Sequence, residues 1–112
     1  MTIETKEQAG TLIIYPKVKH LDSSVSMDFR EKIKAYIDKG HTKMIINLND
    51  VDFIDSSGLG ALVLGHKEMR KRGSLVIVSA KPTINNMLKL VRLDQVLNIF
   101  ENETDALTNL NG

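Results

Sequence analysis

Apolar residues occur along this chain in two patterns, short continuous runs and positions spaced three or four residues apart, and the two patterns alternate. The continuous runs predict strands, and the spaced positions predict helices. We expect the first two strands to form a hairpin across Ala9 and Gly10, with Pro16 at the strand end or at a sheet edge. The predicted strands are residues 2–7, 11–15, 43–48, 75–78 and 96–100.

The spaced positions predict helices over residues 24–39, 57–72, 82–93 and 102–110. Asp22 and Ser23 are candidate caps of the first helix, and Gly40 is its expected stop. The apolar faces of the last two helices are expected to be Ile84, Leu88 and Val91, and Ala106, Leu107 and Leu110. Because right-handed crossovers place helices against a sheet, we expect an α/β fold with a mixed, mostly parallel β-sheet of four to five strands packed against about four helices.

Composition narrows the possible functions. The 112 residues fit a single domain over 1–112, and 42% hydrophobic with 26% charged residues is typical of a globular chain. A net charge of +1 gives no field that would attract nucleic acid or an anionic membrane, so neither is an expected partner. The chain has no cysteine and no apolar run of the roughly 20 residues that a membrane span needs. We therefore expect a soluble, cytoplasmic protein.

The most informative segment is residues 51–60, where a strand-like apolar stretch ends at Asp55, Ser56 and Ser57 and a helical pattern begins. This order puts a serine hydroxyl on a surface turn at a helix N-terminus, where free amide groups and the positive dipole end can face a phosphate. A serine in that place can act as a switch. The alternative is that the two serines only cap the helix, which is worth about 1 kcal/mol.

Two nucleophile or nucleotide chemistries at this junction lack residues that they need. A serine-hydrolase elbow requires glycine two residues before the serine, where the chain has Ile54. A dinucleotide fingerprint starting at Gly58 requires a third glycine, where the chain has Val63, and an acid about 20 residues further on, which is missing.

Metal-dependent chemistries fit no better. A calcium loop over Asp50, Asp52 and Asp55 would put Asp55 at the glycine position and Ala61 at the glutamate position. A phospho-aspartate receiver needs an acidic pair after the first strand, where residues 16–18 are Pro-Lys-Val. Ligand spacing is also missing among the histidines, which are His20, His41 and His66. We therefore expect no metal site, and we expect no cofactor.

Residues 53–60 read Phe-Ile-Asp-Ser-Ser-Gly-Leu-Gly and resemble the signature of the anti-sigma factor antagonists, a family with a STAS domain. The resemblance covers nearly the whole chain. It extends to Leu21 and Asp22 before the first helix, and to residues 90–96, which resemble the family's Leu-x-x-Leu-x-x-Val/Ile segment. In this family the serine directly after the aspartate is phosphorylated, which implies phosphorylation of Ser56.

The resemblance implies a bacterial transcription regulator that works by partner switching. The unphosphorylated protein would bind an anti-sigma factor that is also an ATP-dependent serine kinase of the histidine-kinase-like ATPase fold. The phosphorylated protein would release it, and a PP2C-type phosphatase would restore the binding form. We accordingly expect a phosphoprotein in signal transduction that is no enzyme itself and is a monomer.

The expected partner surface lies beside Ser56. The side chains expected to face the core are Leu59, Leu62, Val63 and Met69, and those expected to point outward are Ala61, Leu64, Gly65 and Glu68. Gly58 and Gly60 indicate either the close approach of another backbone or a tight turn. Asp22 matches an acidic family position, which implies a partner contact, although a helix cap explains it equally well. The predicted contact residues are Asp22, Asp55, Ser56, Ser57, Gly58, Gly60, Ala61 and Leu64.

One position departs from the family pattern, because the chain has Lys19 where the family often has glycine. Two other functions stay open. The same domain serves as a scaffold or adaptor in non-transcriptional or stressosome-like pathways, and the Gly-x-Gly turn is compatible with a small nucleotide-binding or hydrolytic protein. Nucleotide binding would favour the nucleotide-binding or hydrolytic protein. Phosphate acceptance from a separate kinase would favour the partner-switching regulator or the adaptor.

Overall fold

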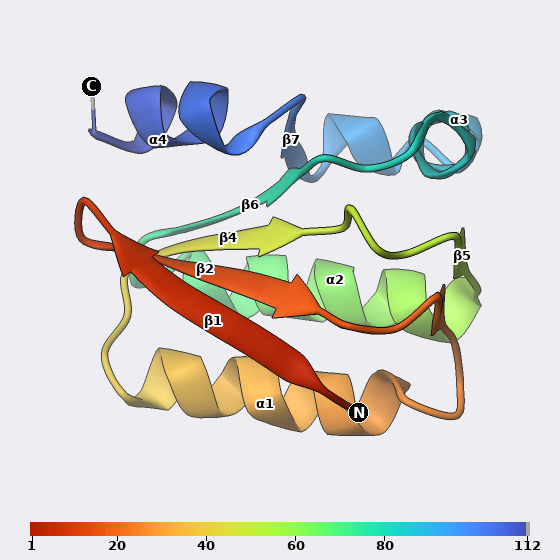
Figure 1. Cartoon of the computed structure of the whole chain (residues 1–112), viewed down its shortest axis with the longest axis horizontal. Coiled ribbons are helices and arrows are strands. Elements are labelled where there is room, and N and C mark those ends of the chain that lie inside the picture. Colours follow the sequence, from red (N-terminus) through yellow and green to blue (C-terminus); the bar gives the residue numbers. More distant parts are fainter. Residues whose placement is uncertain (112) are drawn as a thin grey trace.

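The computed structural model describes residues 1–111, which build a five-stranded sheet of order β1-β2-β4-β6-β7 (Figure 1). Strands β1 (Ile3–Gln8) and β2 (Thr11–Pro16) form the predicted antiparallel hairpin. Its turn uses Ala9 and Gly10 at φ 52° and 76°, the left-handed conformations that tight hairpins require. The other strands pair in parallel; they are β4 (Lys43–Asn47), β6 (Ser74–Val78) and β7 (Asn98–Phe100).

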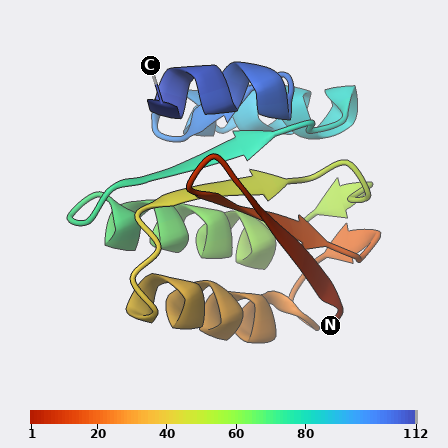
Figure 2. The same ribbon diagram turned by 60° about the vertical axis from the view of Figure 1, so that its left-hand side comes forward.

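Helices cover both faces of this sheet, as Figure 2 shows with α1 and α2 on one side and α4 on the other. Helices α1 (Ser26–Asp38), α2 (Ser56–Met69) and α3 (Pro82–Leu90) connect the parallel strands and share one buried core with residues such as Ile46. Ile45 points the opposite way and packs with α4 (Glu103–Asn111) in a second cluster, because successive strand residues face opposite sides. The predicted fold class is confirmed.

A second, very short strand pair is predicted only in part, because residues 53 and 54 belong to the strand-like stretch but their pairing with another strand is not predicted. Strands β3 (His20–Leu21) and β5 (Phe53–Ile54) pair in parallel, with Leu21 opposite Ile54. The chain enters α1 soon after β3 and enters α2 directly after β5. The pair therefore brings the starts of these two helices side by side.

The third helix is shorter than predicted. It ends at Leu90, and Arg92 then adopts a left-handed conformation with φ 61° before a single 3-10 turn, η1 (Leu93–Gln95). Ile84 and Leu88 are fully buried as expected, but Val91 is exposed. The prediction that Val91 belongs to the buried face is wrong, because the helix has already ended there.

Glu103 attaches α4 to the sheet. Its Oε2 accepts hydrogen bonds from the hydroxyl of Tyr15 and the side-chain amide of Asn47, both at 2.7 Å, and Lys6 lies 3.4 Å from Oε1. Burial opposes the ionisation of Glu103, but these donors together hold its pKa below the usual value. The predicted last helix is confirmed, with Ala106 fully buried against the sheet.

Neither a membrane-spanning helix nor a metal cluster occurs within residues 1–111. No helix there is long and apolar enough to cross a bilayer. No three histidine, cysteine, aspartate or glutamate side chains in that range could together hold a metal ion. The acids of the possible calcium loop serve other contacts, since Asp50 pairs with Lys17 and Asp52 pairs with Lys81.

Candidate functional site

Helix α2 begins at Ser56, and its N-cap is the preceding residue, Asp55. The backbone of Asp55 is extended, with φ −95° and ψ −176°, and its Oδ1 accepts a hydrogen bond from the amide of Gly58 at 3.0 Å. An acidic cap also suits the positive end of the helix dipole. The alternative in which Ser56 and Ser57 are the caps is therefore wrong.

The second carboxylate oxygen of Asp55 binds the turn that precedes α1. Asp55 Oδ2 accepts a hydrogen bond from the amide of Ser23 at 3.1 Å, and the amide of Asp55 donates to the carbonyl of Leu21 at 3.3 Å. The close backbone approach considered for the glycines is found at Gly58, where a β-carbon would lie 2.2 Å from the Leu21 carbonyl oxygen. A β-carbon on Gly60 would meet nothing within 4 Å. Backbone contacts thus fix the two helix starts relative to each other.

Ser56 is exposed on this fixed platform, and Ser57 is half-buried. Because Asp55 caps the helix, the Ser56 hydroxyl is not required for the cap. An exposed hydroxyl on a rigid helix start can enter the active site of another protein without any change in the backbone. This geometry suits a phosphate acceptor.

Asp22 shapes the turn before α1 but does not cap that helix. Its Oδ1 accepts hydrogen bonds from the hydroxyl of Ser24 at 2.5 Å and from the amide of Ser24 at 3.0 Å, and these bonds hold the pKa of Asp22 below its usual value. The N-cap position is occupied by Val25, which makes no side-chain cap bond. The expectation that Asp22 or Ser23 caps α1 is wrong, because the Asp22 side chain is used inside the turn.

The exposed face of α2 differs from the predicted one. Ala61 is 3% exposed and Gly65 is buried, so the expectation that these two residues point outward is wrong. A β-carbon on Gly65 would lie 3.3 Å from the side chain of Ile33, because α1 packs against this side of α2. Gly60 is exposed and Leu64 is half-buried. Of the residues expected to face the core, Leu62 and Met69 are buried, and Leu59 and Val63 are partly buried.

Two exposed apolar side chains near these helix starts are missing from the sequence-based site. Phe53 of β5 is 46% exposed and meets the ring of His20 edge to face at 5.8 Å. Met27, in the first turn of α1, is 70% exposed. The sequence does contain a signal for these two exposed side chains. Each is a bulky apolar residue one or two positions from another apolar residue, and the second one, Ile54 or Phe29, is the one buried in the core.

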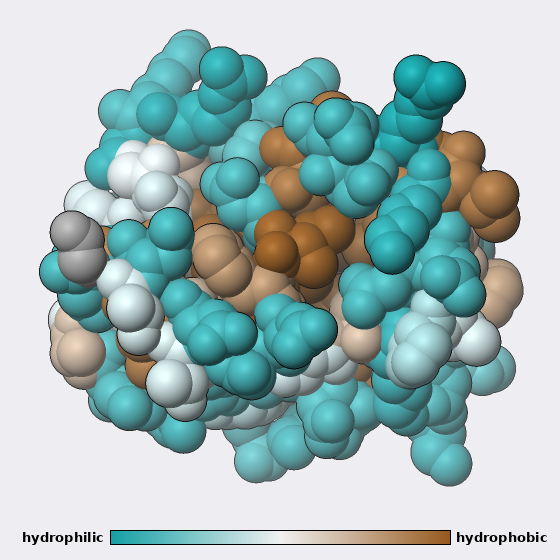
Figure 3. Space-filling view, turned by 90° about the horizontal axis from the view of Figure 1, so that it is seen from above, coloured by the Kyte–Doolittle hydropathy of each residue, from teal (hydrophilic) through white to brown (hydrophobic). Residues whose placement is uncertain are grey.

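A further apolar area lies at the end of α3. Figure 3 views the molecule from the side of α3 and α4, and apolar surface lies at the centre of this view and again at its right edge, on the side where α3 lies in Figure 1. The exposed apolar side chains of this segment are Leu90, Val91 and Val96. They belong to residues 90–96, which carry part of the family resemblance.

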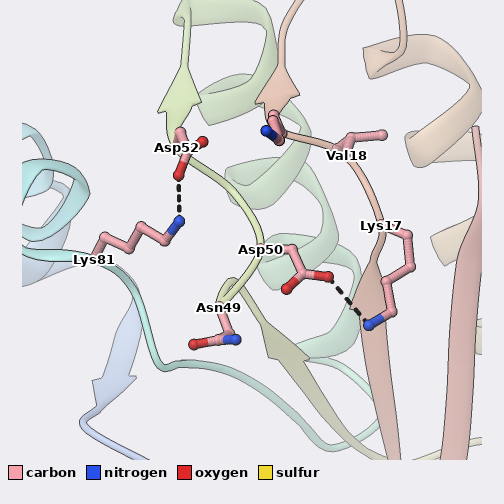
Figure 4. Close-up of a pocket in the computed structure, with 7 residues that line it drawn as sticks. Lys17, Val18, Asn49, Asp50, Asp52 and Lys81 are labelled. Carbon is pink, nitrogen blue, oxygen red and sulfur yellow. Dashed lines mark hydrogen bonds and ion pairs between the residues drawn. The ribbon is translucent and has the colours of Figure 1, made fainter.

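An open polar hollow of about 610 Å³ lies beyond the ends of β2 and β4 (Figure 4). Two ion pairs lie along it: Lys17 contacts Asp50 at 3.1 Å, and Lys81 contacts Asp52. The Asp50 carboxylate raises the pKa of Lys17, and the Lys81 ammonium lowers the pKa of Asp52. The first pair joins the segments that follow β2 and β4, and the second joins the residues that precede α3 and β5. The lining residues are Lys17, Val18, Lys19, Asn49, Asp50, Asp52 and Lys81.

The chain is similar to known proteins over almost its whole length. The model of the STAS domain family matches residues 2–106. An anti-sigma F factor antagonist of Paenibacillus polymyxa is 27% identical over 114 residues, which cover 98% of this chain and 95% of the relative.

Solved structures agree in fold. A candidate anti-sigma factor antagonist of Thermotoga maritima superposes with a TM-score of 0.92 at 25% identity, covering 98% of this chain and 95% of that one. The anti-sigma factor antagonist SpoIIAA in its unphosphorylated form gives a TM-score of 0.70 at 23% identity, with 99% of both chains covered. The structure of Bacillus SpoIIAA in its phosphorylated form gives a TM-score of 0.72 at 22% identity, covering 96% of this chain and 98% of that one. The chain therefore belongs to the STAS domain family, and its relatives include anti-sigma factor antagonists.

Proposed function

We propose that this protein is an anti-sigma factor antagonist that works by partner switching at Ser56. In its unphosphorylated form it binds an anti-sigma factor that is also a serine kinase, and so frees the sigma factor. Phosphorylation of Ser56 releases the anti-sigma factor. The observation that carries the proposal is the exposed hydroxyl of Ser56 directly after Asp55, on a helix start that Asp55 already caps.

Electrostatics explains the release. A phosphate adds a charge of about −1.5 to −2 beside the Asp55 carboxylate. When the partner docks, that charge must lose water next to a like charge, so binding weakens. The amide groups and dipole at the start of α2 stabilise the phosphate in the free protein.

The fold itself need not rearrange. Both carboxylate oxygens of Asp55 are engaged, one by Gly58 and one by Ser23, and the Leu21 carbonyl packs against Gly58. Phosphorylation therefore changes the charge of a surface whose shape is fixed. Release by repulsion at the interface follows from this rigidity.

The contact surface is formed by the two helix starts. From α2 and its cap it takes Asp55, Ser56, Ser57, Gly60 and Leu64, and from the turn before α1 it takes Asp22. Gly58 and Ala61 support this surface from below, since both are buried. Phe53 and Met27 are candidate apolar anchors, because aromatic residues and methionine are enriched at the cores of protein interfaces.

The partners follow from the family role. The relatives described above are antagonists of anti-sigma factors, and SpoIIAA has been solved in phosphorylated and unphosphorylated forms. We assign to this chain a kinase partner of the histidine-kinase-like ATPase fold and a PP2C-type phosphatase. The kinase supplies the catalytic groups, and this chain supplies a hydroxyl and a surface.

A pull-down from the native host tests the proposal, with the wild type, Ser56→Ala and Ser56→Glu as baits. Mass spectrometry identifies the recovered proteins and the phosphorylated residues. We expect Ser56→Ala to retain a kinase-like ATPase that Ser56→Glu loses, and the wild type to carry phosphate on Ser56. Recovery of the same proteins by all three baits, with Ser56 unmodified, would contradict partner switching and favour an adaptor role.

A further inference from the structure

The sequence Asp-Ser-Ser occurs twice, at residues 22–24 and 55–57, and the fold sets the two copies side by side. Each copy directly follows one strand of the parallel pair β3 and β5, in which Leu21 lies opposite Ile54. The two segments therefore leave the paired strands in the same direction and in register. Each then leads into a helix.

A hydrogen bond joins the two copies. The amide of Ser23 donates to Asp55 Oδ2 at 3.1 Å, and Asp55 is the residue directly before Ser56. Ser23 therefore contacts the residue that precedes Ser56, at the same end of the molecule, and both serines are exposed. The second serine of each copy differs from the first: Ser24 is exposed but its hydroxyl donates to Asp22 at 2.5 Å, and Ser57 is half-buried.

From this juxtaposition we propose that Ser23 is a second phosphorylation site for the kinase that modifies Ser56; this inference rests on the proposed function. In the reaction, Ser23 Oγ forms a bond to the γ-phosphorus of ATP, and the bond from that phosphorus to the β–γ bridging oxygen breaks. ADP leaves, and the hydroxyl proton passes to a base of the kinase. The chain provides the acceptor hydroxyl and no catalytic group.

A phosphate on Ser23 has two consequences. It adds a charge of about −1.5 to −2 next to Asp55, so it weakens partner binding as a phosphate on Ser56 does. Two phosphates on adjacent segments also repel each other. We expect the amount of doubly phosphorylated protein to be lower, by about tenfold or more, than the amount expected if the two sites were modified independently.

The test uses the kinase recovered by the Ser56→Ala bait, with ATP and with wild type, Ser23→Ala, Ser56→Ala and Ser24→Ala as substrates. Residue-resolved mass spectrometry follows each site with time. We expect phosphate on Ser23 in wild type, Ser56→Ala and Ser24→Ala, and its loss in Ser23→Ala alone. The matched control is Ser24→Ala, because Ser24 is the neighbouring serine with an engaged hydroxyl.

Each contrary outcome has a separate meaning. Phosphate on Ser56 with none on Ser23 in any substrate would overturn the second site and leave the proposed function standing. Recovery of no kinase, or phosphate on neither serine, would overturn both. Double phosphorylation at the level of independent sites would overturn the repulsion between them.

Discussion

The amide of Ser23 donates a hydrogen bond to the carboxylate of Asp55 at 3.1 Å, and this contact joins residues 32 positions apart in the sequence. The same carboxylate caps α2 through the amide of Gly58. One side chain therefore fixes the start of α2 and holds the turn before α1 against it. The surface around Ser56 is preorganised by this arrangement before any partner arrives.

Replacing Asp55 by alanine removes both hydrogen bonds, so Asp55→Ala should lower the free energy of unfolding by about 2 to 3 kcal/mol. The matched control is Asp55→Asn, which keeps one acceptor oxygen and a good N-cap, and should cost about 1 kcal/mol. Urea denaturation measures both values. Wild-type stability in Asp55→Ala would contradict the role assigned to this carboxylate.

The two glycines of the Gly-x-Gly turn should respond in opposite ways. In Gly58→Ala the new β-carbon would meet the Leu21 carbonyl at 2.2 Å, so the backbone must shift and stability should fall by about 2 kcal/mol or more. In Gly60→Ala the β-carbon enters open space on a helix, and stability should rise by about 0.5 to 1 kcal/mol. Thermal unfolding compares the pair. A similar shift in both variants would be inconsistent with the close approach at Gly58.

Substitution of Ser56 should leave the fold unchanged. Ser56 is exposed and lies outside the cap, so Ser56→Ala should change the free energy of unfolding by less than about 0.5 kcal/mol. Denaturation curves of this variant and the wild type should overlap. A loss of about 1 kcal/mol or more would mean that Ser56 stabilises the helix after all.

The attachment of α4 should depend on pH. The pKa of Glu103 in the folded protein lies below its ordinary value of 4.5, so ionised Glu103 stabilises the fold above that value and the contribution disappears as pH falls through the folded pKa. At pH 7, Glu103→Gln should lower the free energy of unfolding by about 1 to 2 kcal/mol, because hydrogen bonds to a charged acceptor are replaced by neutral ones.

The check is the difference in unfolding free energy between wild type and Glu103→Gln, measured from pH 7 down into the acid range. We expect the difference to shrink as pH falls below about 4.5. A pH-independent difference would show that the contribution of Glu103 is not ionic.

Sequence patterns predicted the main elements well, because long apolar runs and helical spacing are local signals. The buried strands β4 and β6 and the hairpin turn at Ala9 and Gly10 follow directly from them. The pairing of β3 with β5 was not predicted, since two residues are too few for any period and the pairing depends on long-range contacts. That pair is what positions the candidate site.

The buried face of α2 was predicted only in part. Apolar residues occupy nearly all sides of this helix between Leu59 and Leu64, so the sequence does not say which side faces the core. Packing of α1 against α2 decides it, and it buries Ala61 and Gly65. The cap was equally ambiguous locally, because aspartate and serine are both good N-caps and stand next to each other.

The central claim is that a phosphate on Ser56 weakens partner binding without changing the fold. Isothermal titration calorimetry of the recovered anti-sigma factor against unmodified and Ser56-phosphorylated protein tests it most directly, with circular dichroism of both forms as the check on folding. The account predicts that phosphorylation raises the Kd by about a hundredfold or more, because a like-charged pair must be desolvated in the interface. Equal Kd values for the two forms, with Ser56 fully phosphorylated, would contradict it.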